Sequence, residues 1–160
     1  MMNTNLIGLD KAGSEALAEQ LNHLLANYQV LYMNVRGFHW NVQGANFFEL
    51  HAKFEEIYDQ LLLKVDEIAE RILTLGHQPL HGFSDYLRLS RIEEVKAVRD
   101  GHVAIEHILA AYTQLLREQR KILAQASELG DEGTVSLMSD YLSQQEKESW
   151  MLAAYQGRGA

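Results

Sequence analysis

The sequence predicts an all-α protein folded as a four-helix bundle with one long crossover. Apolar residues recur at intervals of three and four along four long segments, which is the spacing of amphipathic helices. No segment shows the alternation typical of a strand, and no internal repeat or domain linker is visible. A stretch rich in turn residues separates the second long segment from the third. At 160 residues the chain fits a single domain, 1–160, with a full hydrophobic core.

The first predicted helix follows a short extended arm, residues 1–9, and begins between Asp10 and Ser14. Gly37 is one place where this helix could end. The chain could equally continue as helix toward Gly44, and the sequence leaves both endings open. The apolar residues at helical spacing in this segment are Leu21, Leu24, Leu25, Tyr28, Leu31, Tyr32 and Val35.

The second predicted helix begins after Asn46, because Asn46 with Glu49 three positions later is a plausible N-cap signal. It ends at Leu75 and Gly76, and Pro79 just beyond prevents its continuation. One narrow apolar stripe along this helix is predicted to face the core. Its members are Phe54, Ile57, Leu61, Val65, Ile68 and Ile72.

The crossover starts with residues 76–90, which have room for one short helical turn. Ser90 and Glu93 then match a capping box, so the sequence predicts a further brief helix. Asp100 and Gly101 interrupt that segment and are placed to cap the third long helix.

The last two long helices are separated by a stop at Leu129 and Gly130. Residues 131–134, DEGT, start the fourth helix, and a short tail, residues 156–160, ends the chain. The apolar residues that support the two helices are Ile105, Ile108, Leu109, Tyr112, Leu115, Leu116, Ile122 and Leu123 in the third, and Val135, Met138, Tyr141, Leu142, Trp150, Met151 and Ala154 in the fourth.

Charge and composition exclude several classes of function. The net charge is −8, from 14 basic and 22 acidic residues, which disfavours attraction to nucleic acid or to an anionic membrane. Residues 1–10 contain no Lys or Arg, and Arg158 is the only basic residue after Lys147. The chain has no cysteine, so disulfides and thiolate chemistry are excluded. It also lacks a membrane-spanning apolar run and a signal peptide pattern, so a cytoplasmic location is expected.

One face of the second predicted helix carries metal-ligand residue types mixed with apolar ones. His51, Glu55, Asp66 and Glu70 fall within an arc of about 100° at the α-helical rotation. Between them lie Leu62, Ala69 and Leu73, outside the core stripe. A face of this composition indicates an interface that also holds a chemically active site.

The length of the helix determines how these residues can combine. His51 and Asp66 are fifteen residues apart, which is roughly 22 Å along a straight helix. They cannot bind one ion, but an antiparallel copy across a two-fold axis would bring His51 and Glu55 beside Asp66 and Glu70 of the partner, forming two equivalent sites. A shared cation would also relieve the repulsion between Asp66 and Glu70. On these pairs alone, solvated surface carboxylates and a structural histidine remain the commoner interpretation.

Four segments together carry a resemblance to a known family. They are RGFHWNVQG at 36–44, HAKFEE at 51–56, DEIAERI at 66–72 and DEGTVSLMSDYLSQQEKESWML at 131–152. His51 follows His39 by twelve residues, and carboxylates follow at positions 55, 66 and 70. With this spacing the chain resembles, from about residue 15 to 155, the Dps family, which comprises the mini-ferritins of starved or peroxide-stressed bacteria. The resemblance implies a ferritin-like bundle with a short helix in the crossover.

The resemblance also implies a function. Dps-like proteins form hollow dodecamers with a two-iron ferroxidase site at each two-fold interface. One subunit would supply His39, His51 and Glu55, and the partner would supply Asp66 and Glu70. His39 with the two partner acids would hold the better-bound iron, and His51 with Glu55 a weaker one. The family oxidises Fe(II), usually with hydrogen peroxide in preference to oxygen, stores ferric mineral and so limits oxidative damage.

Two other classes of function stand beside this one. Many Dps relatives compact DNA, but the lack of basic arms argues against direct DNA binding here. A helical assembly with a vestigial metal site is the third class, which the ligand types at all five positions disfavour. Trp40, beside His39, is interpreted either as an electron donor to stray oxidant or as interface packing, and packing is favoured.

The chain departs from the family pattern at two places. Position 55 is commonly Asp in the family and is Glu here, and the longer arm could loosen the second iron position. Acids near the start of the fourth helix line iron-entry pores in the family, and an expected acid there is Ser136. Acids at a helix start are equally explained by the helix dipole. The candidate pore acids are Glu128, Asp131, Glu132 and Asp140.

Overall fold

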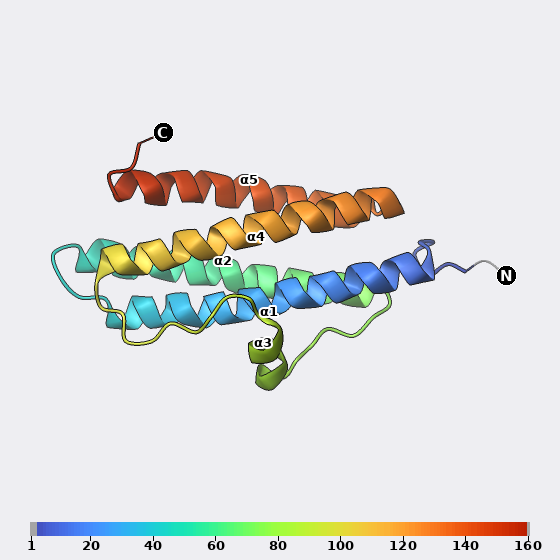
Figure 1. The fold of residues 1–160 in the computed structure, drawn as a ribbon, viewed down its shortest axis with the longest axis horizontal. Coiled ribbons are helices and arrows are strands. Elements are labelled where there is room, and N and C mark those ends of the chain that lie inside the picture. The colour runs from blue at the N-terminus through green and yellow to red at the C-terminus, as the bar shows by residue number, and fades with distance from the viewer. Residues whose placement is uncertain (1–2, 160) are drawn as a thin grey trace.

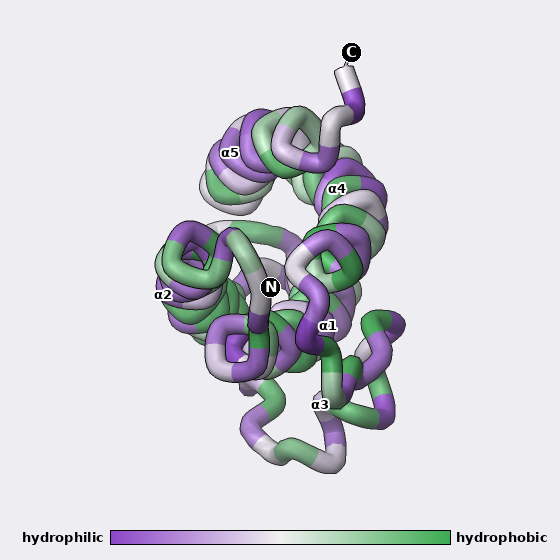
Figure 2. The backbone as a smooth tube through the Cα atoms, turned by 90° about the vertical axis from the view of Figure 1, so that its left-hand side faces the viewer, coloured by the Kyte–Doolittle hydropathy of each residue, from purple (hydrophilic) through white to green (hydrophobic). Residues whose placement is uncertain are grey.

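The computed structural model describes residues 3–159 and confirms the all-α fold. Figure 1 shows the long helices lying along one another. Viewed near the bundle axis, they surround a common centre while the short helix of the crossover lies outside it (Figure 2). The elements are α1 Lys11–Asn41, α2 Phe47–Thr74, α3 Phe83–Leu89, α4 Gly101–Leu129 and α5 Glu132–Tyr155. Within the described residues, β-type backbone pairing is limited to two isolated β-bridges.

The directions of the helices explain the long crossover. Aromatic rings of Tyr32 and Tyr58 meet midway, while His39 meets His51 at one end, so α1 and α2 are antiparallel. By the same reasoning, contacts of α1 with α4 show that these two helices are also antiparallel. Helices α2 and α4 therefore run in the same direction. The chain after α2 has to return along the bundle, about 42 Å for a helix of this length, and α3 lies within this return.

The predicted core stripe of α2 is buried. All six of its members belong to the central apolar cluster, together with Leu17, Leu21 and Leu24 of α1 and Ile105 and Ile108 of α4. Removing this apolar surface from water is the main favourable contribution to folding. None of the described helices combines the length and apolarity needed to cross a membrane.

Most helix ends lie where the sequence predicts them. Of the two endings left open for α1, the structure has the longer one, because the helix continues through Gly37 to Asn41. Asp100 and Asp131 cap α4 and α5 through their side chains, and Gly130 ends α4 in the left-handed conformation with φ 77°. Asn46 lies at the N-cap of α2 as predicted, but its side chain makes no capping hydrogen bond.

The helix predicted after Ser90 is wrong. Residues 91–99 are not helical, and Ser90 instead follows the last residue of α3 as its C-cap. Its hydroxyl accepts a hydrogen bond from the backbone N–H of Ile92, a local contact that competes with helix formation. The predicted turn of helix within residues 76–90 is confirmed as α3.

The predicted extended arm at residues 1–9 is also corrected. Asn5 folds the described part into a turn, because its backbone N–H donates to the Leu9 carbonyl and its side-chain oxygen accepts from the N–H groups of Ile7 and Leu9. An asparagine side chain that bonds to nearby backbone in this way favours a turn over an extended strand. Residues 1 and 2 of the predicted arm lie outside the described residues.

Three asparagines of α1 hold the crossover against the bundle. Asn22 bonds to the backbone of Gln78 and Leu80, Asn27 accepts from Arg91 N–H, and Asn34 bonds to Glu93 and Val95. Backbone groups at 91–95 are thereby satisfied without helical partners. These long-range contacts explain why the capping signal at Ser90 does not produce a helix.

We expect Asn34→Ala to loosen the crossover locally. The Asn34 side chain is buried, donates to Glu93 O at 2.9 Å and accepts from Val95 N at 2.9 Å. Losing both bonds should lower stability by about 1–3 kcal/mol, seen as a lower thermal midpoint at fixed protein concentration and faster hydrogen exchange at Val95. Gln20→Ala, at an exposed position of the same helix, is the control. Unchanged exchange at Val95 would contradict this role of Asn34.

Candidate metal centre

His39 and His51 form a closely coupled pair. His39 lies in the last turn of α1 and His51 in the first turns of α2, and the short connection between the antiparallel helices brings them together. Their rings stack with centroids 3.8 Å apart and planes 14° apart. His39 Nδ1 lies 2.6 Å from the His51 carbonyl oxygen, and His51 Nδ1 lies 2.8 Å from the His39 carbonyl oxygen. Each histidine thus orients the other.

These reciprocal contacts fix the tautomer of both rings. A carbonyl oxygen only accepts hydrogen bonds, so Nδ1 carries the hydrogen in each histidine. Nε2 then keeps its lone pair on both rings and is available to a metal ion. The His39 carbonyl lies in the final turn of its helix, where backbone oxygens lack helical partners, so the bond from His51 also satisfies the helix end.

Two aromatic rings that the sequence reasoning did not assign to the site pack against this pair. Phe47 stacks on His51 with centroids 5.0 Å apart, and Tyr58 meets His39 edge-on at 5.3 Å. The signal for both was present, because Phe47 is four residues before His51 and Tyr58 seven after it, on the same helix face. They restrict the orientations that the two imidazoles can adopt.

Glu55 lies one turn after His51 and is exposed. Its negative charge affects the nearby hydroxyl of Tyr58. Burial is the main cause that raises the pKa of Tyr58, the charge of Glu55 raises it further, and the Arg36 guanidinium lowers it. Glu55 is therefore an accessible carboxylate on the helix face that carries the histidine pair.

Asp66 and Glu70 form an acidic pair near the other end of α2. Both are exposed. Hydrogen bonding to Asp66 and repulsion by its charge raise the pKa of Glu70, with smaller effects from desolvation and Glu67. The two acidic side chains therefore disfavour each other's charge, and a cation bound between them would remove that repulsion.

The structure brings together only part of the predicted ligand set. His39 and His51 meet, Glu55 lies one turn away, and α2 carries Asp66 and Glu70 toward its opposite end. Among residues 3–159, no group of three or more His, Cys, Asp or Glu side chains could hold a metal ion within the single chain. A site that uses all five predicted residues requires a second copy.

The interior of the bundle contains a different polar cluster. Tyr28 donates to Gln119, Gln119 donates to Gln145 at 2.8 Å, and Gln145 donates back to Tyr28 at 2.7 Å. All three side chains are buried, and this closed ring satisfies them mutually. Nearby Glu148 accepts from Tyr112. An iron site inside one bundle uses several carboxylates on facing helices, and among the described core residues Glu148 is the one buried glutamate.

Comparison with known proteins identifies the family. A ferritin-like domain profile matches residues 18–159. The Dps protein of Vibrio cholerae O1, whose structure is described as that of a ferritin-like diiron-carboxylate protein, is 57% identical, with a TM-score of 0.96 over 98% of both chains. The chain belongs to the Dps family.

Other Dps relatives cover nearly the whole length of the chain as well. The DNA protection during starvation protein of Porphyromonas gingivalis is 43% identical over 92% of this chain and 93% of its own. The Dps structure from Bacillus brevis has 32% identity and a TM-score of 0.88, covering 91% of this chain and 97% of that one. The ferritin-like bundle expected from the resemblance is confirmed.

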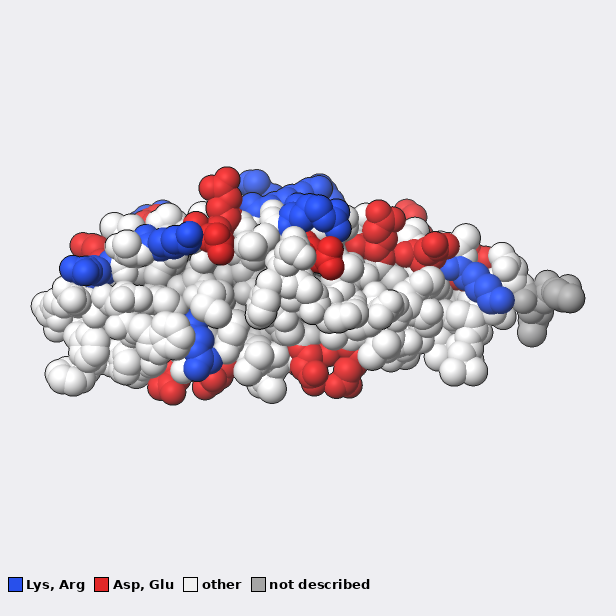
Figure 3. All heavy atoms as spheres, turned by 90° about the horizontal axis from the view of Figure 1, so that it is seen from below, with Lys and Arg blue, Asp and Glu red and all other residues white. Residues whose placement is uncertain are grey.

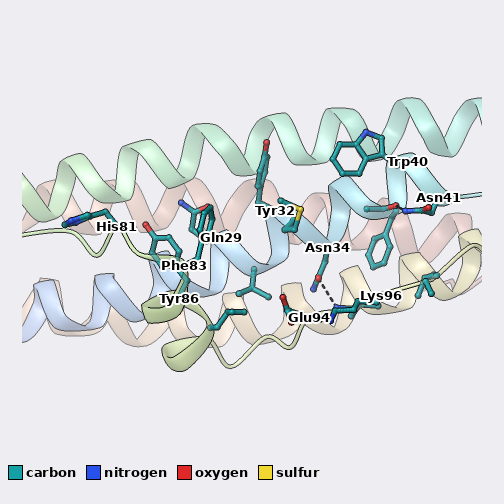
Figure 4. Close-up of a pocket in the computed structure, with 18 residues that line it drawn as sticks. Gln29, Tyr32, Asn34, Trp40, Asn41, His81, Phe83, Tyr86, Glu94 and Lys96 are labelled. Atoms are coloured by element: carbon teal, nitrogen blue, oxygen red, sulfur yellow. Dashed lines mark hydrogen bonds and ion pairs between the residues drawn. The ribbon is translucent and has the colours of Figure 1, made fainter.

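One face of this Dps-family chain is largely uncharged. Figure 3 looks onto the side of α1 and α3, where charged residues gather along the two long edges and leave a broad uncharged band between them. A groove of about 780 Å³ lies between α1 and the crossover, and Figure 4 shows Tyr32, Trp40 and Phe83 among its lining residues. Met33, Trp40, Phe83 and Leu87 on this face are all more than half exposed. Exposed apolar surface of this kind typically marks an interface.

The candidate pore acids differ in their surroundings. Glu128, Glu132 and Asp140 are exposed. Asp131 is buried, caps α5 and pairs with Arg71 at 2.5 Å, so its carboxylate is already engaged in the fold. Ser136 is exposed on the first turns of the same helix.

Proposed function

We propose that this protein is a ferroxidase and iron-storage protein whose active site forms between two copies of the chain. The observation that carries the proposal is the histidine pair, which directs its Nδ1 hydrogens to backbone oxygens and leaves both Nε2 atoms free. Imidazole and carboxylate ligands suit iron. The complementary carboxylates lie roughly 22 Å away along the same helix, too far to act within one chain.

In the proposed site each ligand has a defined role. His39 of one chain, with Asp66 and Glu70 of the partner, holds the more tightly bound Fe(II). His51 and Glu55 hold a second, weaker Fe(II) beside it. Each Fe(II) gives up one electron, and hydrogen peroxide takes both, forming two water molecules with two protons from solvent. Oxygen is the alternative acceptor. The ferric product is stored as mineral, which protects the cell from oxidative damage.

The proposed assembly is a hollow dodecamer in the cytoplasm. The uncharged face of α1 and α3 and the exposed Leu62 and Leu73 on α2 support burial against other copies. The single domain, 1–160, would then be one subunit. The match to Dps proteins over nearly the whole chain supports an oligomer of the kind that this family forms.

Anaerobic titration with Fe(II) tests the proposal directly. Binding should saturate at about two Fe(II) per subunit, the stoichiometry of a two-iron site at each end of an isologous interface. Adding hydrogen peroxide should then oxidise the bound iron faster than adding oxygen does. The same titration on His39→Asn protein is the control. Binding that never saturates, or oxidation no faster than iron in buffer, would refute the ferroxidase proposal.

DNA compaction is the alternative function, favoured by the names of several relatives. We expect no direct binding to duplex DNA at physiological ionic strength, because a chain of net charge −8 offers few cations to replace phosphate counterions. A gel shift at about 0.15 M salt with chelator present measures this. A retained complex under those conditions would support the DNA-binding function instead.

A further inference from the structure

Arg36 lies at the centre of an aromatic cluster beside the histidine pair. Its guanidinium carbon is 4.8 Å from the centroid of Tyr58, 5.2 Å from that of Trp40 and 5.8 Å from that of Tyr32. The guanidinium also donates to the Tyr32 hydroxyl at 2.5 Å. Within the described residues it forms no ion pair with a carboxylate. The positive charge of Arg36 is therefore stabilised by the faces of three aromatic rings and not by a carboxylate.

The cluster is continuous with the proposed iron site. Arg36 is one helical turn before His39, and Trp40 follows His39 directly. Tyr58 contacts the His39 ring at 5.3 Å and the Tyr32 ring at 6.0 Å. Figure 4 shows Tyr32 and Trp40 extending from the same side of α1. A strong oxidant produced at His39 would therefore form next to these electron-rich rings.

The charge of Arg36 has opposite effects on a ring before and after oxidation. A neutral indole attracts a cation over its face. When the indole of Trp40 gives one electron to an oxidant, it becomes a cation, and the attraction turns into repulsion between two positive charges. The guanidinium stays protonated throughout, so this repulsion cannot be relieved by proton loss from Arg36. Oxidation of Trp40 is consequently disfavoured.

We propose that Arg36 protects Trp40 from one-electron oxidation, with Tyr32 and Tyr58 holding the guanidinium in place. The step that Arg36 opposes is transfer of one electron from the indole to a one-electron oxidant, such as the hydroxyl radical that a single Fe(II) forms from hydrogen peroxide; the radical becomes hydroxide, and the indole N–H proton is then lost to solvent. Oxidising equivalents formed at the metal centre are then left for Fe(II). The source of the oxidant rests on the proposed ferroxidase function, whereas the protection itself is a property of the cluster and needs no iron.

The test uses the metal-free assembled protein and a photogenerated ruthenium(III) tris-bipyridine oxidant with persulfate. Peptide mass spectrometry measures oxidation of Trp40 relative to Trp150, an internal reference that is 61% exposed in the single chain, where Trp40 is 59% exposed. No cation lies over the Trp150 ring among the described residues. In Arg36→Gln the ratio of Trp40 to Trp150 oxidation should rise roughly tenfold. Arg36→Lys keeps the charge without the planar stack and should give a smaller rise.

Accessibility is separated from charge by acrylamide quenching of Trp40 fluorescence in a Trp150→Phe background. Protection by Arg36 requires the oxidation ratio to rise without an equal rise in quenching. An unchanged ratio in Arg36→Gln overturns the proposal. If that variant does not assemble, the wild-type protein alone tests the proposal. Trp40 must then be oxidised more slowly than Trp150 after both oxidation rates are corrected for the accessibility that acrylamide quenching measures.

A second arm replaces the ruthenium oxidant with Fe(II) and hydrogen peroxide. Oxidised Trp40 should accumulate in Arg36→Gln and not in wild type. If Arg36 protects Trp40 from the ruthenium oxidant but Fe(II) and hydrogen peroxide oxidise Trp40 in neither protein, the protective role of Arg36 stands. That result would count against iron chemistry at this site. The opposite result, equal Trp40 damage in both proteins with either oxidant, would refute the protective role.

Discussion

Mixed oligomers of two inactive variants are expected to recover about a quarter of wild-type Fe(II) oxidation, the fraction of sites that random pairing across two-fold interfaces restores. The first parent carries His39→Asn and His51→Asn. Asparagine keeps a donor nitrogen close to the position of Nδ1 but has no counterpart of Nε2, so the reciprocal backbone bonds can persist. The second parent carries Asp66→Asn and Glu70→Gln, which keep shape and remove charge.

Each parent alone should lose at least about tenfold in oxidation rate, because every interface lacks ligands from one side. In the mixture, an interface between unlike subunits contains one complete site and one that lacks four ligands. His23→Asn, a histidine away from the pair, controls for the substitution itself. Oligomers proven to be mixed by mass spectrometry that recover no activity would show that the ligands do not come from two chains.

Introducing charge on the exposed apolar face of α2 is expected to abolish both assembly and activity. Leu62 and Leu73 are 48% and 58% exposed and lie on the same face of α2 as the proposed ligands. In the variant Leu62→Glu/Leu73→Glu, two added charges on each chain would be buried at the interface without partners, at a cost of several kcal/mol. All five ligand residues remain, so any loss of oxidation would follow from the loss of the partner.

Light scattering measures the outcome of this second prediction. Wild type should have about twelve times the single-chain mass of 18.2 kDa, and the double variant should have a small multiple of it. Ala124→Glu places the same charge at an exposed position of α4, which lies diagonally across the bundle from α2, and should leave the assembly intact. A monomeric wild-type protein, or an active monomeric variant, would each contradict the composite site.

The successes and failures of the sequence predictions have distinct physical causes. Apolar spacing located four helices because burying one face of each is the dominant force in a bundle. The signal at Ser90 failed because Asn27 and Asn34, over fifty residues away in the chain, bond to the backbone that would have formed the helix. A local capping pattern carries no information about partners at that distance.

For the site, the ligand types could be read from the residues of α2 and the end of α1, and the helical rise showed that His51 and Asp66 cannot share an ion within one chain. The hydrogen bonds from His39 and His51 to each other's backbone, and the position of Arg36 among three rings, became visible only in the folded chain. Periodicity gives the face on which a side chain lies, because that depends on one helix alone. The tautomer of a histidine and the neighbours of a guanidinium depend on how two helices pack, and that is set by contacts between residues far apart in the chain.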